Sequence, residues 1–335
     1  MQQVAVIIPY YQRAPGILRR ALDGVWSQDL PSNIALRVVV VDDASPHPAS
    51  AEITTPHPEI TVLNQPNGGP GSARNRGLDL VRSWGDVDVV AFLDSDDIWH
   101  SDHLAHALSV LAEGYDFFCC DNARPGSFAR FSEDAPALRN AGAALADKGI
   151  VLSKDPIVRG FPSHSIEDDI VTGYISHTST VVLRAETVRS IRFDVDLRHA
   201  SEDRMFWIAV ACSGARIAIS WACNVTCGRG VNMFFSAYDW NAPATIDRLG
   251  SQLLFAEKLR RRADLTALRA EFANRRARIT RRAYCFLFVR LLLKRRAPPL
   301  GSFRRLLRID PILPLRMPGL FLAVFFSGRR QALDI

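Results

Sequence analysis

Two short, uninterrupted runs of branched apolar residues constrain the fold of this chain more than any other feature. VAVIIPY at residues 4–10 and LRVVVVDD at residues 36–43 do not alternate polar with apolar side chains. Both faces of each predicted strand must therefore be covered. An amphipathic helix is predicted between them at residues 17–28. Strand, helix and strand in this order predict a βαβ unit in a mostly parallel sheet.

The same alternation continues along the chain. Further strands are predicted at residues 60–65, 88–94, 115–122 and 216–223, and further helices at residues 72–84 and 102–114. Residues 123–170 lack a clear period and predict an irregular insertion, and residues 173–188 predict a strand that runs into a helix. The fold class is therefore α/β, a Rossmann-like, mostly parallel sheet flanked by helices, followed by a helical C-terminal extension.

Polar residues gather in the loops that follow the predicted strands. They are Pro9, Tyr11 and Arg13 after the first strand, Asp42 and Asp43 after the second, Asn67 and Gly68 after the third, and Asp94, Ser95 and Asp96 after the fourth. Since the carboxyl ends of parallel strands meet at one edge of a sheet, we expect these loops to form one site, where open α/β sheets bind their ligands.

Three carboxylates, Asp94, Asp96 and Asp97, lie within four positions at the end of an apolar strand. Mg²⁺ and Mn²⁺ favour such hard oxygen ligands, and they usually take one or two carboxylates plus substrate phosphates. The pattern allows a metal that bridges a nucleotide diphosphate to the protein. It equally allows a turn or a cap for the following helix, the role for which Asp97 is the best candidate.

The glycine-rich stretch NGGPGSARNRG at residues 67–77 contains neither Gly-Lys-Ser/Thr nor G-x-G-x-x-G. It therefore predicts neither a P-loop nor a dinucleotide site, but a helix start that presents Arg74 near a base or a ribose. Glu202 and Asp203 begin another predicted helix. Acids in that position are stabilised by the helix dipole, and they equally suit a general base.

The charge of the chain is strongly asymmetric. Residues 256–335 hold 20 Lys and Arg against 5 Asp and Glu, whereas residues 1–255 hold 21 against 30. We expect two domains, residues 1–240 and residues 241–335. The basic and amphipathic second domain predicts binding to an anionic membrane surface. Solvated packing helices are the alternative, and nucleic acid is not expected because no RNA-binding motif accompanies the charge.

The six cysteines show neither disulfide spacing nor a second pair that would complete a zinc site with Cys223 and Cys227. Reduced structural thiols are therefore expected. The sequence begins without a signal-peptide pattern, and no apolar run reaches the roughly 18 residues of a membrane span. We accordingly expect a cytoplasmic protein that is peripheral on the cytoplasmic face of the inner membrane.

Five motifs in order, PYYQR, VVVVDDAS, NGGPGSARNRGLD, AFLDSDDIW and SEDRMFW, resemble the inverting family 2 glycosyltransferases of the GT-A fold, and the chain as a whole resembles their exopolysaccharide (succinoglycan-type) branch. The resemblance spans roughly residues 3–232. It implies a nucleotide-sugar pocket, a D-x-D that holds ribose and Mn²⁺ or Mg²⁺, and a catalytic Glu-Asp pair. The implied residues are Pro9, Tyr11, Arg13, Asp42, Asp43, Asn67, Gly68 and Arg74 for the nucleotide, Asp94, Ser95 and Asp96 for the D-x-D with Asp94 and Asp96 as metal ligands, and Asp203 beside Glu202 as the base.

Three further residues have more than one interpretation. His177 faces the acceptor, supplies another metal ligand or is a structural histidine, and Arg229 and Asn232 in CGRGVN close over the diphosphate or lie in a surface turn. The implied reaction moves one sugar from a nucleotide-diphosphate sugar, by default a UDP-hexose such as UDP-glucose, to a lipid-linked oligosaccharide or another glycan. The alternatives are a nucleotidyltransferase and a non-catalytic protein that binds nucleotide sugars or lipid.

Overall fold

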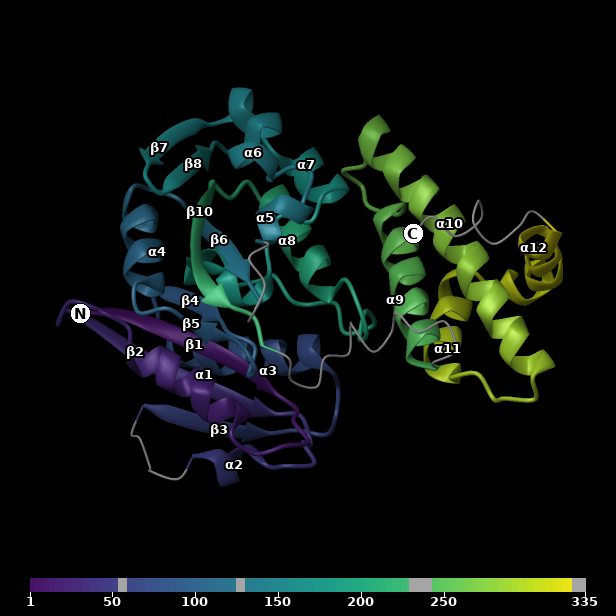
Figure 1. Ribbon diagram of the computed structural model, residues 1–335, viewed down its shortest axis with the longest axis horizontal. Coiled ribbons are helices and arrows are strands. Elements are labelled where there is room, and N and C mark those ends of the chain that lie inside the picture. The colour runs from purple at the N-terminus through teal and green to yellow at the C-terminus, as the bar shows by residue number, and fades with distance from the viewer. Residues whose placement is uncertain (54–58, 125–129, 229–242, 327–335) are drawn as a thin grey trace. The chain divides into compact units, whose positions relative to one another are not determined.

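Figure 1 shows the computed structural model of the 335-residue chain, which describes residues 1–53, 59–124, 130–228 and 243–326. The chain divides into two units. The first comprises Met1–Phe193 and Phe206–Val231, and the second comprises Asp194–Met205 and Asn232–Ile335. The domain boundary expected at residue 240 lies outside the described residues.

The first unit is built on one sheet, in which the described strands follow the order β3-β2-β1-β4-β9-β6-β10-β8-β7 and β5 pairs with β10. The strands are β1 (Gln2–Tyr10), β2 (Ile34–Asp42), β3 (Ile60–Asn64), β4 (Val89–Phe92), β5 (Ile98–Trp99), β6 (Phe117–Ala123), β7 (Ile150–Lys154), β8 (Ile157–Phe161), β9 (Val182–Arg184) and β10 (Ile217–Thr226).

The predicted parallel centre of the sheet is confirmed. β1 pairs in parallel with β2 and β4, β2 pairs in parallel with β3, and β6 pairs in parallel with β10. β9 lies antiparallel between β4 and β6. Because β1 is buried from Val4 to Tyr10, its continuous apolar sequence reflects cover on both faces.

Helices supply that cover. The described α-helices of the chain's first 212 residues are α1 (Ile17–Trp26), α2 (Ala49–Glu52), α3 (Pro70–Trp84), α4 (His103–Ala112), α5 (Phe131–Asp134), α6 (Arg139–Gly142), α7 (Glu167–Thr172) and α8 (Glu202–Cys212), and the 3₁₀ turns are η1 (Ala143–Lys148), η2 (Thr178–Thr180) and η3 (Ala185–Val188).

Alternate side chains of β1 face different helices. Val6 and Ile8 share one hydrophobic core cluster with Leu18 of α1 and Leu104 of α4. On the opposite face α3 approaches so closely that a Cβ atom on Gly77 would lie 2.5 Å from the Cγ2 atom of Ile7. The central strands are therefore sandwiched between helices, an arrangement that leaves the strand ends and their loops for the site.

Two predicted segments differ from the structure. Residues 123–170 were expected to be irregular, but they contain the antiparallel hairpin β7–β8, which extends the sheet by pairing β8 with β10. Ile150 and Val151 on β7 are exposed, so this edge strand has no continuous buried face to mark it in the sequence. Of residues 173–188 only Val182–Arg184 form a strand, and the 3₁₀ turn η3 replaces the expected helix.

The second unit contains the predicted helical C-terminal region. Its described helices are α9 (Pro243–Leu259), α10 (Ala267–Leu293), α11 (Leu300–Ile309) and α12 (Leu313–Phe326). The Thr266 hydroxyl caps α10 by accepting the Arg269 backbone N–H at 3.2 Å. Buried Glu257 pairs with Arg260 and Arg281, so part of the basic charge is neutralised within this unit.

Within the described part of the chain, no single helix is long and apolar enough to cross a membrane. Helices α11 and α12 are long and apolar enough only when they are taken together, and the chain bends by 112° between them.

Candidate active site

Gln12, which follows β1, ties three of the predicted loops together. Its backbone N–H donates to the Ser45 hydroxyl at 2.7 Å, and that hydroxyl donates back to the Gln12 carbonyl at 2.9 Å. The Gln12 side-chain amide donates to the Ser95 hydroxyl at 3.1 Å. Gln12 and Ser95 are both buried. The loops after β1, β2 and β4 therefore meet at one edge of the sheet, and Ser95 serves as an anchor between them.

The other residues singled out after β1 have different environments. Pro9 is buried within the strand, Tyr11 is half-buried and Arg13 is exposed. Tyr11 and Arg13 thus lie beside the Gln12 anchor with surface available to a ligand, and the assignment of buried Pro9 to the nucleotide pocket stays a prediction.

Asp42 and Asp43 both use their carboxylates to hold backbone. Asp42 accepts the backbone N–H groups of Ser45 and Ala49 at 2.7 and 2.8 Å. Asp43 accepts from Gly68 and Gly69 at 2.7 and 2.8 Å. Because buried N–H groups need partners, these two carboxylates fix the loops that line the edge of the sheet. Contact of either carboxylate with a nucleotide base stays a prediction.

The glycine-rich loop is bound to the end of β2 by further contacts. The exposed Asn67 donates its side-chain amide to the Asp43 carbonyl at 2.9 Å, and Gln65 donates to the Asp43 carboxylate at 2.7 Å. A Cβ atom on Gly68 would lie 2.5 Å from the Ser72 hydroxyl oxygen. A larger residue at position 68 would therefore push the loop away from the start of α3.

Arg74 connects α3 to the end of β4. Its guanidinium donates to the Asp94 carboxylate at 2.6 Å and lies 5.3 Å from the ring centre of Phe193, while only 3% of the side chain is exposed. Burial alone would raise the pKa of Asp94, but the positive charges of Arg74 and His177 outweigh burial and lower that pKa. Asp94 is therefore ionised at neutral pH and held in place from α3.

Carboxylates crowd the turn after β4. Asp97 is buried, and its pKa is raised to about 6, chiefly by desolvation and further by the charges of Asp94 and Asp96, against the lowering effect of His177. Asp96 is half-buried in the same turn. The charges of Asp94 and Asp96 that raise the pKa of Asp97 create a negative field that a divalent cation would offset. The hard oxygen donors of Asp94 and Asp96 fit Mn²⁺ or Mg²⁺.

Asp97 does not cap the following helix. α4 begins at His103, with Asp102 at its N-cap position, whereas the Asp97 carboxylate accepts the Gly228 backbone N–H at 2.7 Å and the Ser179 hydroxyl at 2.5 Å. Gly228 is required there, because a Cβ atom would lie 1.8 Å from the carbonyl oxygen of Asp96. The turn after β4 is thus braced by the chain that follows β10.

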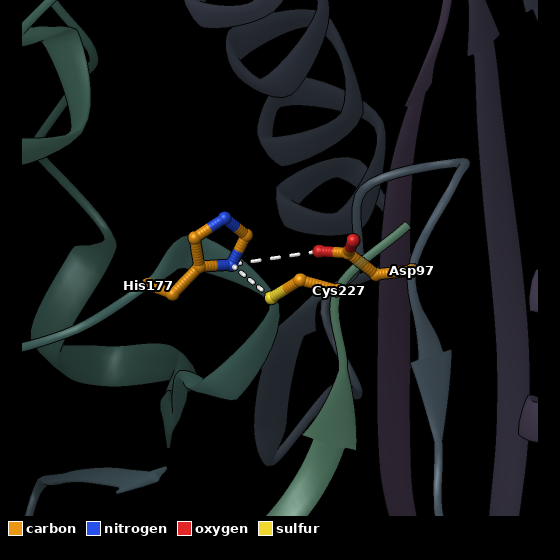
Figure 2. Close-up of side chains that lie close together, drawn as sticks. All are labelled: Asp97, His177 and Cys227. Atoms are coloured by element: carbon orange, nitrogen blue, oxygen red, sulfur yellow. Dashed lines mark hydrogen bonds and ion pairs between the residues drawn. The ribbon is translucent and has the colours of Figure 1, made fainter. Parts of the chain in front are cut away.

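His177 and Cys227 complete this part of the site (Figure 2). The Nδ1 atom of His177 lies 3.4 Å from an Asp97 carboxylate oxygen and 3.8 Å from the Cys227 sulfur. Burial lowers the pKa of His177, but Cys227, Asp97 and Asp94 outweigh it and raise that pKa well above its usual value. Cys227 was not predicted as a site residue. Its sequence signals were its spacing of four residues from Cys223, which no second pair completed, and its position directly before GRGVN.

The four remaining predicted site residues lie in the second unit or outside the described residues. Glu202 and Asp203 are the first two residues of α8 and belong to the second unit, where the Asp203 carboxylate accepts the Arg204 backbone N–H at 2.7 Å. Arg229 and Asn232 lie outside the described residues. The roles assigned to these four residues stay predictions.

Comparisons with known proteins agree with the resemblance. Residues 5–151 match the family model described as Glycosyl transferase family 2. The succinoglycan biosynthesis protein ExoW of Rhizobium meliloti (strain 1021) is 36% identical over 244 residues, which cover 70% of this chain and 72% of ExoW.

Two solved structures share the fold. S. aureus TarS 1–349 in complex with UDP-GlcNAc has a TM-score of 0.57 and 19% identity, with 99% of this chain and 93% of that chain covered. The mannosyltransferase PcManGT from Pyrobaculum calidifontis, in complex with GDP-Man and Mn²⁺, has a TM-score of 0.54 and 20% identity, with 98% and 87% covered. These structures share the GT-A fold with this chain, in agreement with the sequence matches to the family model and to ExoW. The chain belongs to glycosyltransferase family 2, and it is a glycosyltransferase.

Proposed function

We propose that the enzyme transfers a single sugar from a nucleotide-diphosphate sugar to a hydroxyl group of a lipid-linked or other glycan acceptor in exopolysaccharide biosynthesis. The name of ExoW supports the biosynthetic role, and the UDP-GlcNAc complex of TarS supports a UDP-sugar as the donor. The observation that carries the proposal is the joining of the loops after β1, β2 and β4 through Gln12, Ser45 and Ser95.

In this proposal the donor binds along that edge of the sheet. Tyr11 and Arg13 border the nucleotide because they combine accessible side chains with a backbone fixed by Gln12. The loop at residues 67–69, held by Asp43, lines the pocket beside Arg74. This assignment gives the two aspartates after β2 a positioning role, in addition to any contact with the base.

Asp94 and Asp96 are proposed to hold Mn²⁺ or Mg²⁺, an assignment supported by the crowded carboxylates and by the Mn²⁺ complex of PcManGT. Such an ion stabilises the negative charge that grows on a diphosphate leaving group. Arg74 keeps Asp94 ionised and oriented. Asp94 thus has one carboxylate oxygen bound to the protein, while Asp96 lies two residues further along the same turn.

The proposed reaction is one displacement at the anomeric carbon. Asp203, with Glu202 beside it, accepts the proton of the acceptor hydroxyl. The hydroxyl oxygen bonds to the anomeric carbon as the bond from that carbon to the diphosphate breaks, and the configuration of the carbon inverts. The start of a helix favours an ionised carboxylate, the form that a base requires.

We further propose that the second unit binds an anionic membrane surface, with the enzyme peripheral on the cytoplasmic face of the inner membrane. Several apolar side chains of α12 and its start are exposed, among them Leu315 at 83%, Phe325 at 63% and Phe326 at 78%. Lys294, Arg295 and Arg296 are exposed after α10. Apolar and basic side chains of this kind support interfacial binding, and a lipid-linked acceptor would lie at the same surface.

A donor screen tests the proposed reaction. The full chain is incubated with Mn²⁺ or Mg²⁺, each nucleotide sugar in turn, and membrane extract as acceptor, while release of the nucleoside diphosphate is followed. We expect release with one class of donor. Asp203→Asn should lower the rate of nucleoside diphosphate release by at least about 100-fold, in line with the loss of a general base. Glu202→Gln, which changes the neighbouring carboxylate, is measured for comparison.

The outcome separates the alternatives. Pyrophosphate release from a nucleoside triphosphate and a sugar phosphate would identify a nucleotidyltransferase. Donor binding without turnover under every condition would identify a binding protein. No diphosphate release with any donor contradicts the proposed transfer.

A further inference from the structure

Asp97, His177 and Cys227 come from three distant segments of the chain, and their candidate ligand atoms all lie within 4.8 Å of one another (Figure 2). Among the described residues this is the one group of three His, Cys, Asp or Glu side chains with that property. We propose that these three residues bind a zinc ion, at a site separate from the Mn²⁺ or Mg²⁺ site assigned to Asp94 and Asp96.

Two of the three ligand separations suit zinc, and the third, between the Asp97 oxygen and the Cys227 sulfur, is at most 4.8 Å. A tetrahedral zinc ion with bonds of about 2.0–2.1 Å to nitrogen and oxygen and about 2.3 Å to sulfur separates adjacent nitrogen and oxygen ligands by about 3.3 Å, and nitrogen and sulfur ligands by about 3.6 Å. The His177 Nδ1 atom lies 3.4 Å from the Asp97 oxygen and 3.8 Å from the Cys227 sulfur. A contraction of a few tenths of an ångström would therefore complete two edges of the coordination shell.

The donor atoms select the metal. Mg²⁺ and Mn²⁺ prefer carboxylates, carbonyls and water, whereas a thiolate together with an imidazole favours zinc. Three protein ligands leave a fourth position for water or a substrate group. The cluster therefore differs in chemistry from the all-oxygen pair Asp94 and Asp96, even though Asp97 adjoins Asp96 in the chain.

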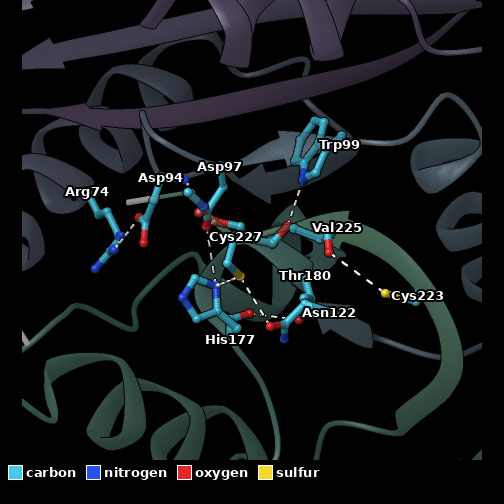
Figure 3. Close-up of polar contacts among 12 residues, drawn as sticks. Arg74, Asp94, Asp97, Trp99, Asn122, His177, Thr180, Cys223, Val225 and Cys227 are labelled. Carbon is cyan, nitrogen blue, oxygen red and sulfur yellow. Dashed lines mark hydrogen bonds and ion pairs between the residues drawn. The ribbon is translucent and has the colours of Figure 1, made fainter. Parts of the chain in front are cut away.

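Neighbouring groups already orient the ligands (Figure 3). The Asp97 carboxylate accepts the Gly228 backbone N–H and the Ser179 hydroxyl. The Thr180 hydroxyl donates to the His177 carbonyl at 2.7 Å and fixes the backbone that carries the imidazole. Supporting contacts of this kind are characteristic of metal sites, because they hold each ligand in the orientation that the metal needs.

Asn122 fits the change that metal binding would impose on Cys227. With the thiol protonated, Cys227 donates to the Asn122 side-chain oxygen at 3.2 Å. In the described part of the chain, the buried Nδ2 atom of Asn122 has no hydrogen-bond partner. Zinc binding replaces the S–H bond of Cys227 with a sulfur–zinc bond and the N–H bond at His177 Nδ1 with a nitrogen–zinc bond, and both protons are released to solvent. A half-turn of the Asn122 amide then points the unpartnered Nδ2 N–H group at the thiolate and turns the Oδ1 oxygen away from the thiolate.

Zinc at this position would brace the proposed donor site. It would link the turn after β4, the segment before η2 and the end of β10, which carry Asp97, His177 and Cys227 respectively. The chain directly after Cys227 contacts Asp96, since Gly228 approaches its carbonyl oxygen closely enough to exclude a side chain. The zinc-binding cluster thus adjoins the backbone of a proposed metal ligand, but its existence does not depend on the proposed reaction.

The test measures metal binding by the full chain without donor or acceptor. Protein treated with a chelator under reducing conditions is titrated with Co²⁺, which reports a cysteine ligand through a thiolate-to-cobalt charge-transfer band. We expect one equivalent of Co²⁺ to produce the band and one equivalent of Zn²⁺ to remove it. Cys227→Ser should abolish the band, and His177→Gln should weaken Zn²⁺ binding by at least about tenfold.

Two variants serve as matched controls. Cys223→Ser removes a half-buried thiol four residues away, whose nearest described partner is the Val225 carbonyl at 4.0 Å, and it should leave the band unchanged. Asp96→Asn removes a carboxylate of the other proposed metal site and should also retain the band. Circular dichroism checks that each variant is folded. If Cys227→Ser does not fold, the Zn²⁺ affinity of His177→Gln tests the proposal instead.

Four results would overturn the proposal. The first is absence of the band in the unsubstituted protein at excess Co²⁺, and the second is persistence of the band in Cys227→Ser. The third is undiminished Zn²⁺ affinity in folded His177→Gln, and the fourth is loss of the band in Cys223→Ser. Loss of the band in Asp96→Asn would show one shared metal site and overturn the claim of a separate zinc site. A failed donor screen affects none of these readouts, so the proposed function and the zinc site fail independently.

Discussion

Replacing Arg74 with methionine tests how the protein stabilises the carboxylate at the end of β4. Removing one partner of a buried ion pair typically costs 3–5 kcal/mol, because a charge is left without compensation. The Asp94 side chain is 26% exposed, and water partly solvates it. We therefore expect Arg74→Met to lower the free energy of unfolding by about 2–3 kcal/mol at pH 7. Methionine keeps the apolar contact with the Phe193 ring.

The loss should depend on pH. Arg74 is the largest of the opposing charges that lower the pKa of Asp94 against the effect of burial. The stability that a depressed carboxyl pKa contributes is present above the ordinary pKa and is lost as the pH falls through the folded-state pKa. In Arg74→Met burial is less opposed, so Asp94 takes up a proton at a higher pH. The difference between the two proteins should therefore shrink as the pH falls from 7 toward 4.

Denaturant unfolding at several pH values, followed by circular dichroism, measures both effects. Arg37→Met is the matched control, because Arg37 pairs with Asp86, which is 59% exposed, and an exposed pair contributes about 0–1 kcal/mol. Adding Asp94→Asn to Arg74→Met should recover part of the loss. The reasoning is refuted if Arg74→Met costs no more than Arg37→Met, or if its cost is the same at pH 7 and pH 4.

Two further variants test the contact between Gly228 and Asp96 and the proposed membrane surface. Gly228→Ala would place a Cβ atom 1.8 Å from the Asp96 carbonyl oxygen. We therefore expect a folded protein whose metal-dependent donor binding, measured by calorimetry, is at least about tenfold weaker. Unchanged donor binding would show that the contact between Gly228 and Asp96 does not position the metal ligand. Replacing Lys294, Arg295 and Arg296 with glutamine removes three exposed charges, each worth about 1 kcal/mol at an anionic surface. Sedimentation with anionic vesicles should then show roughly 100-fold weaker binding, and equal binding would exclude this surface as the contact.

The sequence predicted the centre of the fold because its strands are buried on both faces. Continuous apolar runs such as residues 36–43 are distinctive when helices cover both sides of a strand. The hairpin β7–β8 was missed because it lies at the edge of the sheet, where Ile150 is 61% exposed and propensity gives little signal. The short antiparallel strand β9 was only partly located, since three residues carry too little pattern to fix their ends.

The candidate site was partly predictable for a different reason. Residues in loops after parallel strands must meet at one edge, so the meeting of the loops near Ser45 and Ser95 follows from topology. The pairing of Cys227 with His177 does not, because the contact depends on the course of β9 and β10 far along the chain. Zinc patterns that a sequence reveals have short spacings such as Cys223 to Cys227, whereas the fold brings Asp97, His177 and Cys227 together from distant segments.

Calorimetric titration of the donor identified in the screen, with and without Mn²⁺, tests the central claim most directly. That claim places the donor and its metal at the carboxyl edge of β1, β2 and β4. Asp96→Asn should abolish the metal-dependent part of donor binding, whereas Asp86→Asn, the same change at an exposed ion pair, should bind as the unsubstituted enzyme does. Donor binding by Asp96→Asn that strengthens with Mn²⁺ as it does in the unsubstituted enzyme would contradict the claim.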